Sequence, residues 1–82
     1  MKVSIFGLGY VGCVSAACFA DAGHDVIGVD VNPLKVNIIN QGRSPVVEPR
    51  MEELIGLATA QERLRATTDA AEAVGATEIS MV

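Results

Sequence analysis

The stretch VSIFGLGYVG, residues 3–12, decides the fold of this chain. Its first four residues are typical of a short buried strand. Its three glycines then follow the spacing of a tight turn that opens a helix. Gly7 permits the turn, Gly9 lets the main chain approach a phosphate, and Gly12 lets helix and strand pack closely. The stretch therefore predicts a phosphate-binding turn at a helix N-terminus, although glycines that only make a turn remain the alternative.

Tyr10 and Val11 stand at the expected start of that helix. The first backbone N–H groups of a helix lack intrahelical partners, and the helix dipole favours an anion there. We therefore expect both residues to bind a pyrophosphate through the main chain, so that their side chains need not be specific.

Asp30 lies eighteen residues after Gly12, at the end of a second apolar strand predicted over residues 25–30. A right-handed crossover between parallel strands brings the ends of both strands to one edge of the sheet, so that Asp30 meets the glycine turn. Its carboxylate can accept hydrogen bonds from ribose hydroxyls and would repel a 2′-phosphate, which favours NAD over NADP. Lys35, in the first turn of the next helix, either reaches back towards Asp30 and the ribose or is a solvated helix lysine.

The remaining pattern predicts an α/β fold, the N-terminal portion of a Rossmann-type doubly wound parallel sheet. Asn32 and Pro33 are typical of an N-cap and the first residue of a helix, and Glu48 is expected to cap the following helix rather than to line a site. Asp69 and Glu72 have the spacing of a capping box. The expected elements are strands over residues 2–6, 25–30, 65–68 and 77–82, with helices over 11–22, 33–41, about 50–58 and 70–75. Because the last strand is cut short, we expect residues 1–82 to be one partial NAD-binding domain, with catalytic and substrate domains absent.

Composition narrows the class of partner. The 82 residues carry ten acids and six bases, a net charge of −4, and no basic cluster, so nucleic acid is not expected as a partner. No apolar run approaches the roughly 18 residues of a membrane span. The segment from Lys2 to Ala22 imitates a secretory signal peptide, but a signal has no reason to place three glycines at these offsets.

Cysteine and histidine usage gives no metal or nucleophile site. Cys13 and Cys18 lie five residues apart, about 140° around a helix, and cannot form a disulfide with each other. We expect both to be small packing residues in a reducing cytoplasm. His24 has no partner at ligand spacing, and no Ser/His/Asp set or Walker lysine occurs. The sequence thus predicts a cofactor site, no metal and no catalytic residue.

Several motifs resemble one known family. IFGLGYVG, GHDVIGVD and INQGRSPVVEP are similar to the amino-terminal part of the nucleotide-sugar 6-dehydrogenases that act on UDP-glucose and GDP-mannose. The resemblance extends from Met1 to Asp69 and so covers essentially the whole chain. The SPVVEP loop is most similar to the GDP-mannose branch, because the UDP-glucose enzymes more often carry tyrosine where this chain has Val47.

The resemblance implies a cytoplasmic, homo-oligomeric enzyme of alginate biosynthesis that uses two NAD to oxidise the sugar 6-hydroxyl of GDP-mannose through a cysteine-bound intermediate. It implies that Tyr10 and Val11 offer main-chain groups to the NAD pyrophosphate and that Asp30 and Lys35 contact the adenosine ribose. The catalytic cysteine of the family lies beyond Val82. One departure is Arg50, where the family usually has glycine. A UDP-glucose 6-dehydrogenase and a non-catalytic NAD-sensing module remain the alternatives.

Overall fold

A computed structural model describes residues 1–81 and confirms the α/β prediction. The elements follow in the order β1 (Lys2–Phe6), α1 (Tyr10–Asp21), β2 (Asp25–Val29), α2 (Pro33–Asn40), α3 (Pro49–Ala60), β3 (Leu64–Thr67), α4 (Ala70–Ala76) and β4 (Ile79–Met81). Most boundaries agree with the prediction to within one or two residues, and Val82 lies outside the described residues.

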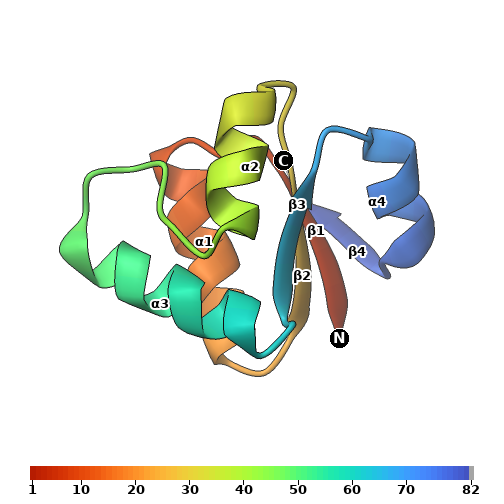
Figure 1. The fold of residues 1–82 in the computed structure, drawn as a ribbon. Helices are drawn as coiled ribbons and strands as arrows, with labels where there is room; N and C mark the ends of the chain where they lie inside the picture. The colour runs from red at the N-terminus through yellow and green to blue at the C-terminus, as the bar shows by residue number, and fades with distance from the viewer. Residues whose placement is uncertain (82) are drawn as a thin grey trace.

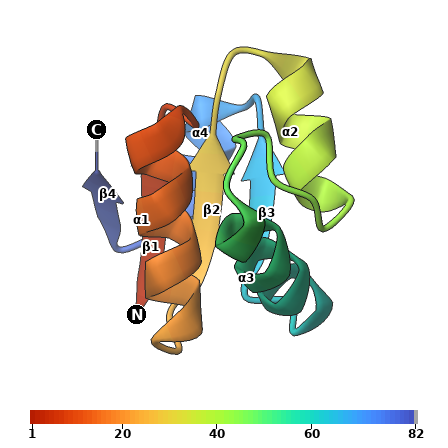
Figure 2. The same cartoon turned by 90° about the vertical axis from the view of Figure 1, so that its left-hand side faces the viewer.

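The four strands form one sheet in the order β3-β2-β1-β4, and every neighbouring pair is parallel (Figure 2). Phe6 at the end of β1 is in register with Val29 at the end of β2, which is in register with Thr67 at the end of β3. The carboxyl ends of these strands therefore meet at one edge of the sheet, where the glycine turn follows β1 and Asp30 follows β2.

Helices cover both faces of the sheet, as a doubly wound fold requires. Figure 1 shows α1, α2 and α3 on one side of the sheet and α4 on the other. The larger core lies under the three helices and includes Val3, Ile5, Leu8, Ile39 and Ile55, while the α4 side buries Ile27, Val29 and Ala73 with Phe6 packed against them. No helix within residues 1–81 is long and apolar enough to span a bilayer.

Side chains cap three of the four described helices. Asn32 accepts a hydrogen bond from the Leu34 amide, Glu48 from the Arg50 amide and Asp69 from the Glu72 amide. The capping role predicted for Glu48 is confirmed. Of the two hydrogen bonds of a capping box, α4 has the one that Asp69 accepts. The Glu72 carboxylate does not return the other, because it pairs with Arg65 at 2.6 Å.

Two expectations from the sequence are wrong. Cys13 is buried as predicted, but Cys18 is exposed, because α1 buries one narrow face made of Cys13, Ala16, Ala17 and Ala20. The last strand begins at Ile79 and not at Thr77, because Thr77 is the C-cap of α4. Its hydroxyl donates to the Ala73 carbonyl at 2.8 Å and also lies 3.0 Å from Ser4 Oγ.

Polar side chains form hydrogen bonds with both outer strands of the sheet. The Asn40 side-chain amide pairs with the backbone of Ala66 on β3, donating to its carbonyl at 2.9 Å and accepting from its amide at 2.8 Å. On the other side, the buried Ser4 hydroxyl lies 2.8 Å from Ser80 Oγ and so connects β1 to β4. Neither contact is visible in the sequence pattern.

Candidate dinucleotide-binding site

The glycine turn has the geometry that the sequence predicts. Gly7 has φ of +92°, and its amide donates to the Val29 carbonyl at 2.8 Å. A Cβ on Gly12 would lie 1.8 Å from the Gly7 carbonyl oxygen, so helix α1 is pressed directly against the turn. A Cβ on Gly9, by contrast, would meet nothing within 4 Å. The turn therefore needs glycine at Gly7 and Gly12, whereas Gly9 keeps open the space from which a ligand would approach.

The N-terminus of α1 is left open to that space. Its N-cap is Gly9, which has no side chain to cap the helix, and the Cys13 amide donates to the Gly9 carbonyl at 2.9 Å. The amides of Tyr10 and Val11 precede this bond and so lack partners one turn back in the helix. Val11 is 76% exposed and Tyr10 is 60% exposed. An anion at this position would be held by main-chain amides and the helix dipole.

Two hollows flank the end of β1. One, of about 580 Å³, lies over the glycine turn and the start of α1 and is lined by Ile5, Phe6, Gly7, Gly9, Tyr10, Val11, Gly12, Ser15 and Met81. The other, of about 390 Å³, lies over the ends of β2 and β3 and is lined by Phe6, Gly7, Val29, Asp30, Val31, Thr68 and Ala70. Phe6 and Gly7 line both, so one extended ligand could lie across the turn with an end in each hollow.

Asp30 directs its carboxylate to the glycine turn. Oδ2 accepts from the Leu8 amide at 2.8 Å, and Oδ1 accepts from the Asn32 amide at 2.9 Å. These two hydrogen bonds, together with the nearby charge of Lys35, hold the pKa of Asp30 below its ordinary value. The lowered pKa keeps Asp30 anionic, and each carboxylate oxygen has a further lone pair that can accept from a ribose hydroxyl.

Lys35 lies at the same edge of the sheet, in the first turn of α2. Its charge acts on Asp30 and on Cys13, although the ion pairs within 4 Å in residues 1–81 are Arg43–Glu52 and Arg65–Glu72. Lys35 thus influences Asp30 through its charge and forms no ion pair with it among residues 1–81. The structure thus brings together six of the seven residues that the sequence predicts for the site, Gly7, Gly9, Tyr10, Val11, Gly12 and Asp30, and Lys35 acts on Asp30 through its charge.

Leu8, Gly28 and Cys13 also shape the site, and sequence reasoning assigned none of them. The Leu8 side chain is fully buried against Gly28 of β2, where a Cβ would lie 2.7 Å from Leu8 Cδ2. Cys13 donates from Sγ to the Leu8 carbonyl at 3.4 Å, and burial raises the pKa of its thiol. A glycine inside a strand signals a close approach by another part of the chain, and this signal could have identified Gly28.

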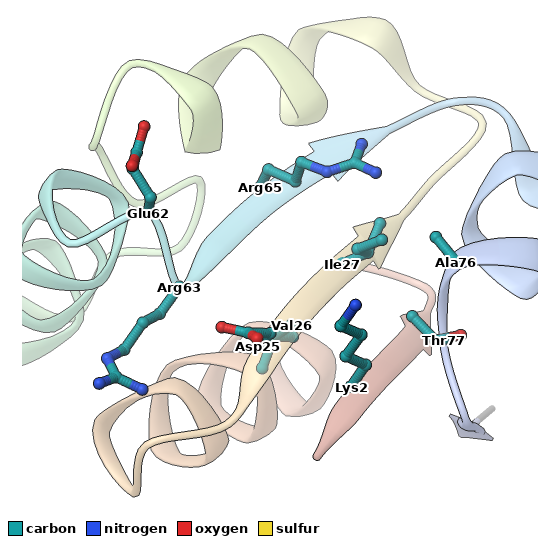
Figure 3. Close-up of a pocket in the computed structure, with 9 residues that line it drawn as sticks. All are labelled: Lys2, Asp25, Val26, Ile27, Glu62, Arg63, Arg65, Ala76 and Thr77. Atoms are coloured by element: carbon teal, nitrogen blue, oxygen red, sulfur yellow. The ribbon is translucent and has the colours of Figure 1, made fainter.

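A third pocket, of about 200 Å³, lies at the opposite edge of the sheet, beside the amino ends of β1, β2 and β3 (Figure 3). Two of its cations are already engaged by the protein. Arg63 donates to the Gly23 carbonyl at 2.7 Å, and Arg65 pairs with Glu72. The carboxyl edge, with its open helix N-terminus, is the better candidate for an anionic ligand.

Comparison with known proteins agrees with this geometry. Residues 1–82 match the profile of the UDP-glucose/GDP-mannose dehydrogenase family, NAD binding domain. The chain belongs to this family. NAD is accordingly the cofactor of the dehydrogenase domain, and the glycine turn with its two hollows fits a dinucleotide that carries a central pyrophosphate.

Members of the dehydrogenase family match the chain along its whole length. It is 55% identical to GDP-mannose 6-dehydrogenase of Pseudomonas syringae pv. tomato over 82 residues, which are all of this chain and 19% of the relative. A ternary complex of GDP-mannose dehydrogenase from Pseudomonas aeruginosa superposes with a TM-score of 0.96 at 51% identity, covering 98% of this chain and 18% of the other. UDP-glucose dehydrogenase from Pyrobaculum islandicum gives 0.91 at 46% identity, covering 96% and 18%. The chain thus spans about a fifth of the length of these relatives.

Proposed function

We propose that this chain is the NAD-binding part of a GDP-mannose 6-dehydrogenase, which oxidises the sugar 6-hydroxyl of GDP-mannose to a carboxylate. The observation that carries the proposal is the 55% identity to a GDP-mannose 6-dehydrogenase over every residue of the chain. A UDP-glucose 6-dehydrogenase is the second candidate, with 46% identity to the structure from Pyrobaculum islandicum. The family resemblance further supports a cytoplasmic homo-oligomer in alginate biosynthesis as part of the same proposal.

Each site residue then has a separate task in holding NAD. The main-chain amides of Tyr10 and Val11 bind the pyrophosphate, and Gly9 leaves room for its oxygens. Asp30 accepts from the adenosine ribose hydroxyls, and Lys35 contacts the same ribose from α2. When bound, NAD supplies the hydride acceptor of the oxidation.

Selectivity for NAD over NADP follows from the charge at the end of β2. Because two backbone amides keep Asp30 ionised, its carboxylate would repel a 2′-phosphate. The next residue, Val31, is 93% exposed and carries no charge that could offset this repulsion. The adenosine end of the site therefore favours a free 2′-hydroxyl.

Calorimetric titration of the chain with NAD and with NADP tests this proposal, after circular dichroism has shown that each protein is folded. We expect saturable binding of NAD, and a loss of about 5- to 150-fold in affinity for Asp30→Ala, which corresponds to about 1–3 kcal/mol for a hydrogen bond of this kind. Asp25→Ala removes a carboxylate from the other end of β2 and should leave affinity unchanged. Equal NAD affinities of the Asp30→Ala variant and the parent chain would overturn the ribose assignment.

Reversing the charge at the end of β2 tests directly whether Asp30 selects NAD over NADP. Asp30→Gly combined with Val31→Arg removes the repelling carboxylate and adds a cation, and should shift the preference towards NADP. An unchanged ratio of NAD to NADP affinity would contradict the role of Asp30. Formation of NADH by the full-length protein with UDP-glucose and not with GDP-mannose would contradict the sugar assignment.

A further inference from the structure

We propose that Leu8 is a positioning residue, which holds the glycine turn in its NAD-binding shape through a latch formed by Leu8, Gly28 and Asp30. This inference rests on the proposed function and goes beyond it, because neither Leu8 nor Gly28 is among the residues expected to touch the cofactor.

The side chain of Leu8 provides the first half of the latch. It is 0% exposed, although it lies in a turn between two exposed glycines. It packs on Gly28, where a Cβ would lie 2.7 Å from Cδ2 and 3.3 Å from Cδ1. The glycines with positive φ are Gly7, Gly23 and Gly42, so the strand backbone at Gly28 does not require glycine. Gly28 is needed for the space that Leu8 fills.

The main chain of Leu8 provides the second half. Its amide donates to Asp30 Oδ2 at 2.8 Å, and its carbonyl accepts from Cys13 Sγ at 3.4 Å. Asp30 is itself held by the Asn32 amide at 2.9 Å. A turn that contains Gly7 and Gly9 has more backbone freedom than other turns, and ordering it would cost binding free energy. Contacts from β2, α1 and the start of α2 order the turn before a ligand arrives.

The latch joins the two ends of the proposed NAD site. Asp30 binds the turn that receives the pyrophosphate and is also the proposed acceptor for the adenosine ribose. A displaced Leu8 would therefore move the phosphate-binding amides and leave Asp30 without one of its two backbone partners. A substitution at Gly28, beneath the turn, should accordingly lower the affinity for a ligand that Gly28 does not touch.

The first experiment measures the affinity of the chain for ADP, which carries the adenosine ribose and a diphosphate. We expect Gly28→Ala to lower affinity at least about tenfold after correction for the folded fraction, the effect of losing one or two hydrogen bonds to a charged group. Gly75→Ala is the matched control, because a Cβ there meets nothing within 4 Å. Adding Leu8→Ala to Gly28→Ala removes the clash and should recover part of the affinity. Unchanged ADP affinity in a folded Gly28→Ala variant would overturn the latch and leave the proposed function standing.

The second experiment needs no ligand and so separates the latch from NAD binding. Amide hydrogen exchange should show the Leu8 N–H protected in the parent chain. It should exchange at least about tenfold faster in Asp30→Ala, which removes the acceptor of the Leu8 N–H. Exchange of the Leu8 amide in the parent chain at the rate of an exposed loop would overturn the latch, whether or not ADP binds. Protection with no binding of ADP or NAD would support the latch and contradict the proposed function.

Discussion

Gly9 and Gly12 show how two residues of one motif can be needed for different reasons. Gly12 is required by the fold, because a side chain would overlap the Gly7 carbonyl oxygen at 1.8 Å. The fold does not require Gly9, because a side chain there would project into open space, and we propose that a ligand does. The motif GLGYVG therefore contains separable structural and binding positions.

Alanine substitutions should separate these roles. Gly12→Ala should lower the free energy of unfolding by about 3 kcal/mol or more through overpacking against backbone. Gly9→Ala should cost about 1 kcal/mol or less, the typical difference between glycine and alanine at an N-cap, yet lower NAD affinity at least about tenfold. Urea denaturation and calorimetric titration measure the two quantities. A Gly9→Ala variant that is destabilised as much as Gly12→Ala, or one that binds NAD like the parent chain, would contradict this division.

The sequence predicted the site at the residue scale wherever the information was local. Glycine spacing identified Gly7, Gly9 and Gly12, and the position of Asp30 at a strand end identified the acid. The hydrogen bond from the Leu8 amide to Asp30 could not be predicted, because it depends on how the turn lies on β2, whereas a glycine inside a strand does signal the close approach at Gly28. The seven predicted site residues stay predictions until ligand binding is measured.

At the scale of elements, Asn40 gives β3 a partner on its outer side. Its side-chain amide makes the two hydrogen bonds with Ala66 that a neighbouring strand would make. The helix caps at Asn32, Glu48 and Asp69 were predictable from adjacent residues. The Asn40–Ala66 contact joins residues 26 positions apart and has no local pattern. Sequence periodicity therefore predicted the elements but not the contacts that hold them in place.

Substitution of Asn40 should destabilise the fold. Asn40→Ala removes two hydrogen bonds worth about 1 kcal/mol each, so we expect a loss of about 2 kcal/mol in the free energy of unfolding. Asn40→Asp should cost at least as much, because a carboxylate oxygen would face the Ala66 carbonyl. Asn37→Ala, at an exposed asparagine of the same helix, is the control. If chemical denaturation gives the same stability for Asn37→Ala and Asn40→Ala, the strand-like role of Asn40 is wrong.

At the scale of the whole molecule, the sheet is covered unequally. Three helices pack on one face, and only the seven-residue α4 packs on the other within the described chain (Figure 1). A domain of this size buries only about 60% of its unfolded surface, so its stability is modest. Parallel strands and the right-handed crossover predicted this architecture, because they depend on backbone chirality rather than on particular contacts.

The two cysteines differ in exposure, so the rate at which a reagent modifies each thiol can measure opening of the structure. Cys18 is exposed, whereas the thiol of Cys13 is buried beneath the glycine turn and donates a hydrogen bond to the Leu8 carbonyl. A thiol reagent should modify Cys18 at once and Cys13 only when the protein opens. We expect Gly28→Ala to speed modification of Cys13 at least about tenfold and saturating NAD to slow it, with Cys18 as internal control.

Mass spectrometry of the labelled chain over time would give both rates. Equal Cys13 rates in the parent chain and the variant would contradict a loosened turn. A Cys13 rate that rises only slightly with denaturant would indicate opening of the turn alone, and a steep rise would indicate unfolding of the whole domain. The modification rate of Cys13, whose thiol is buried under the glycine turn, would thus measure how often that turn opens.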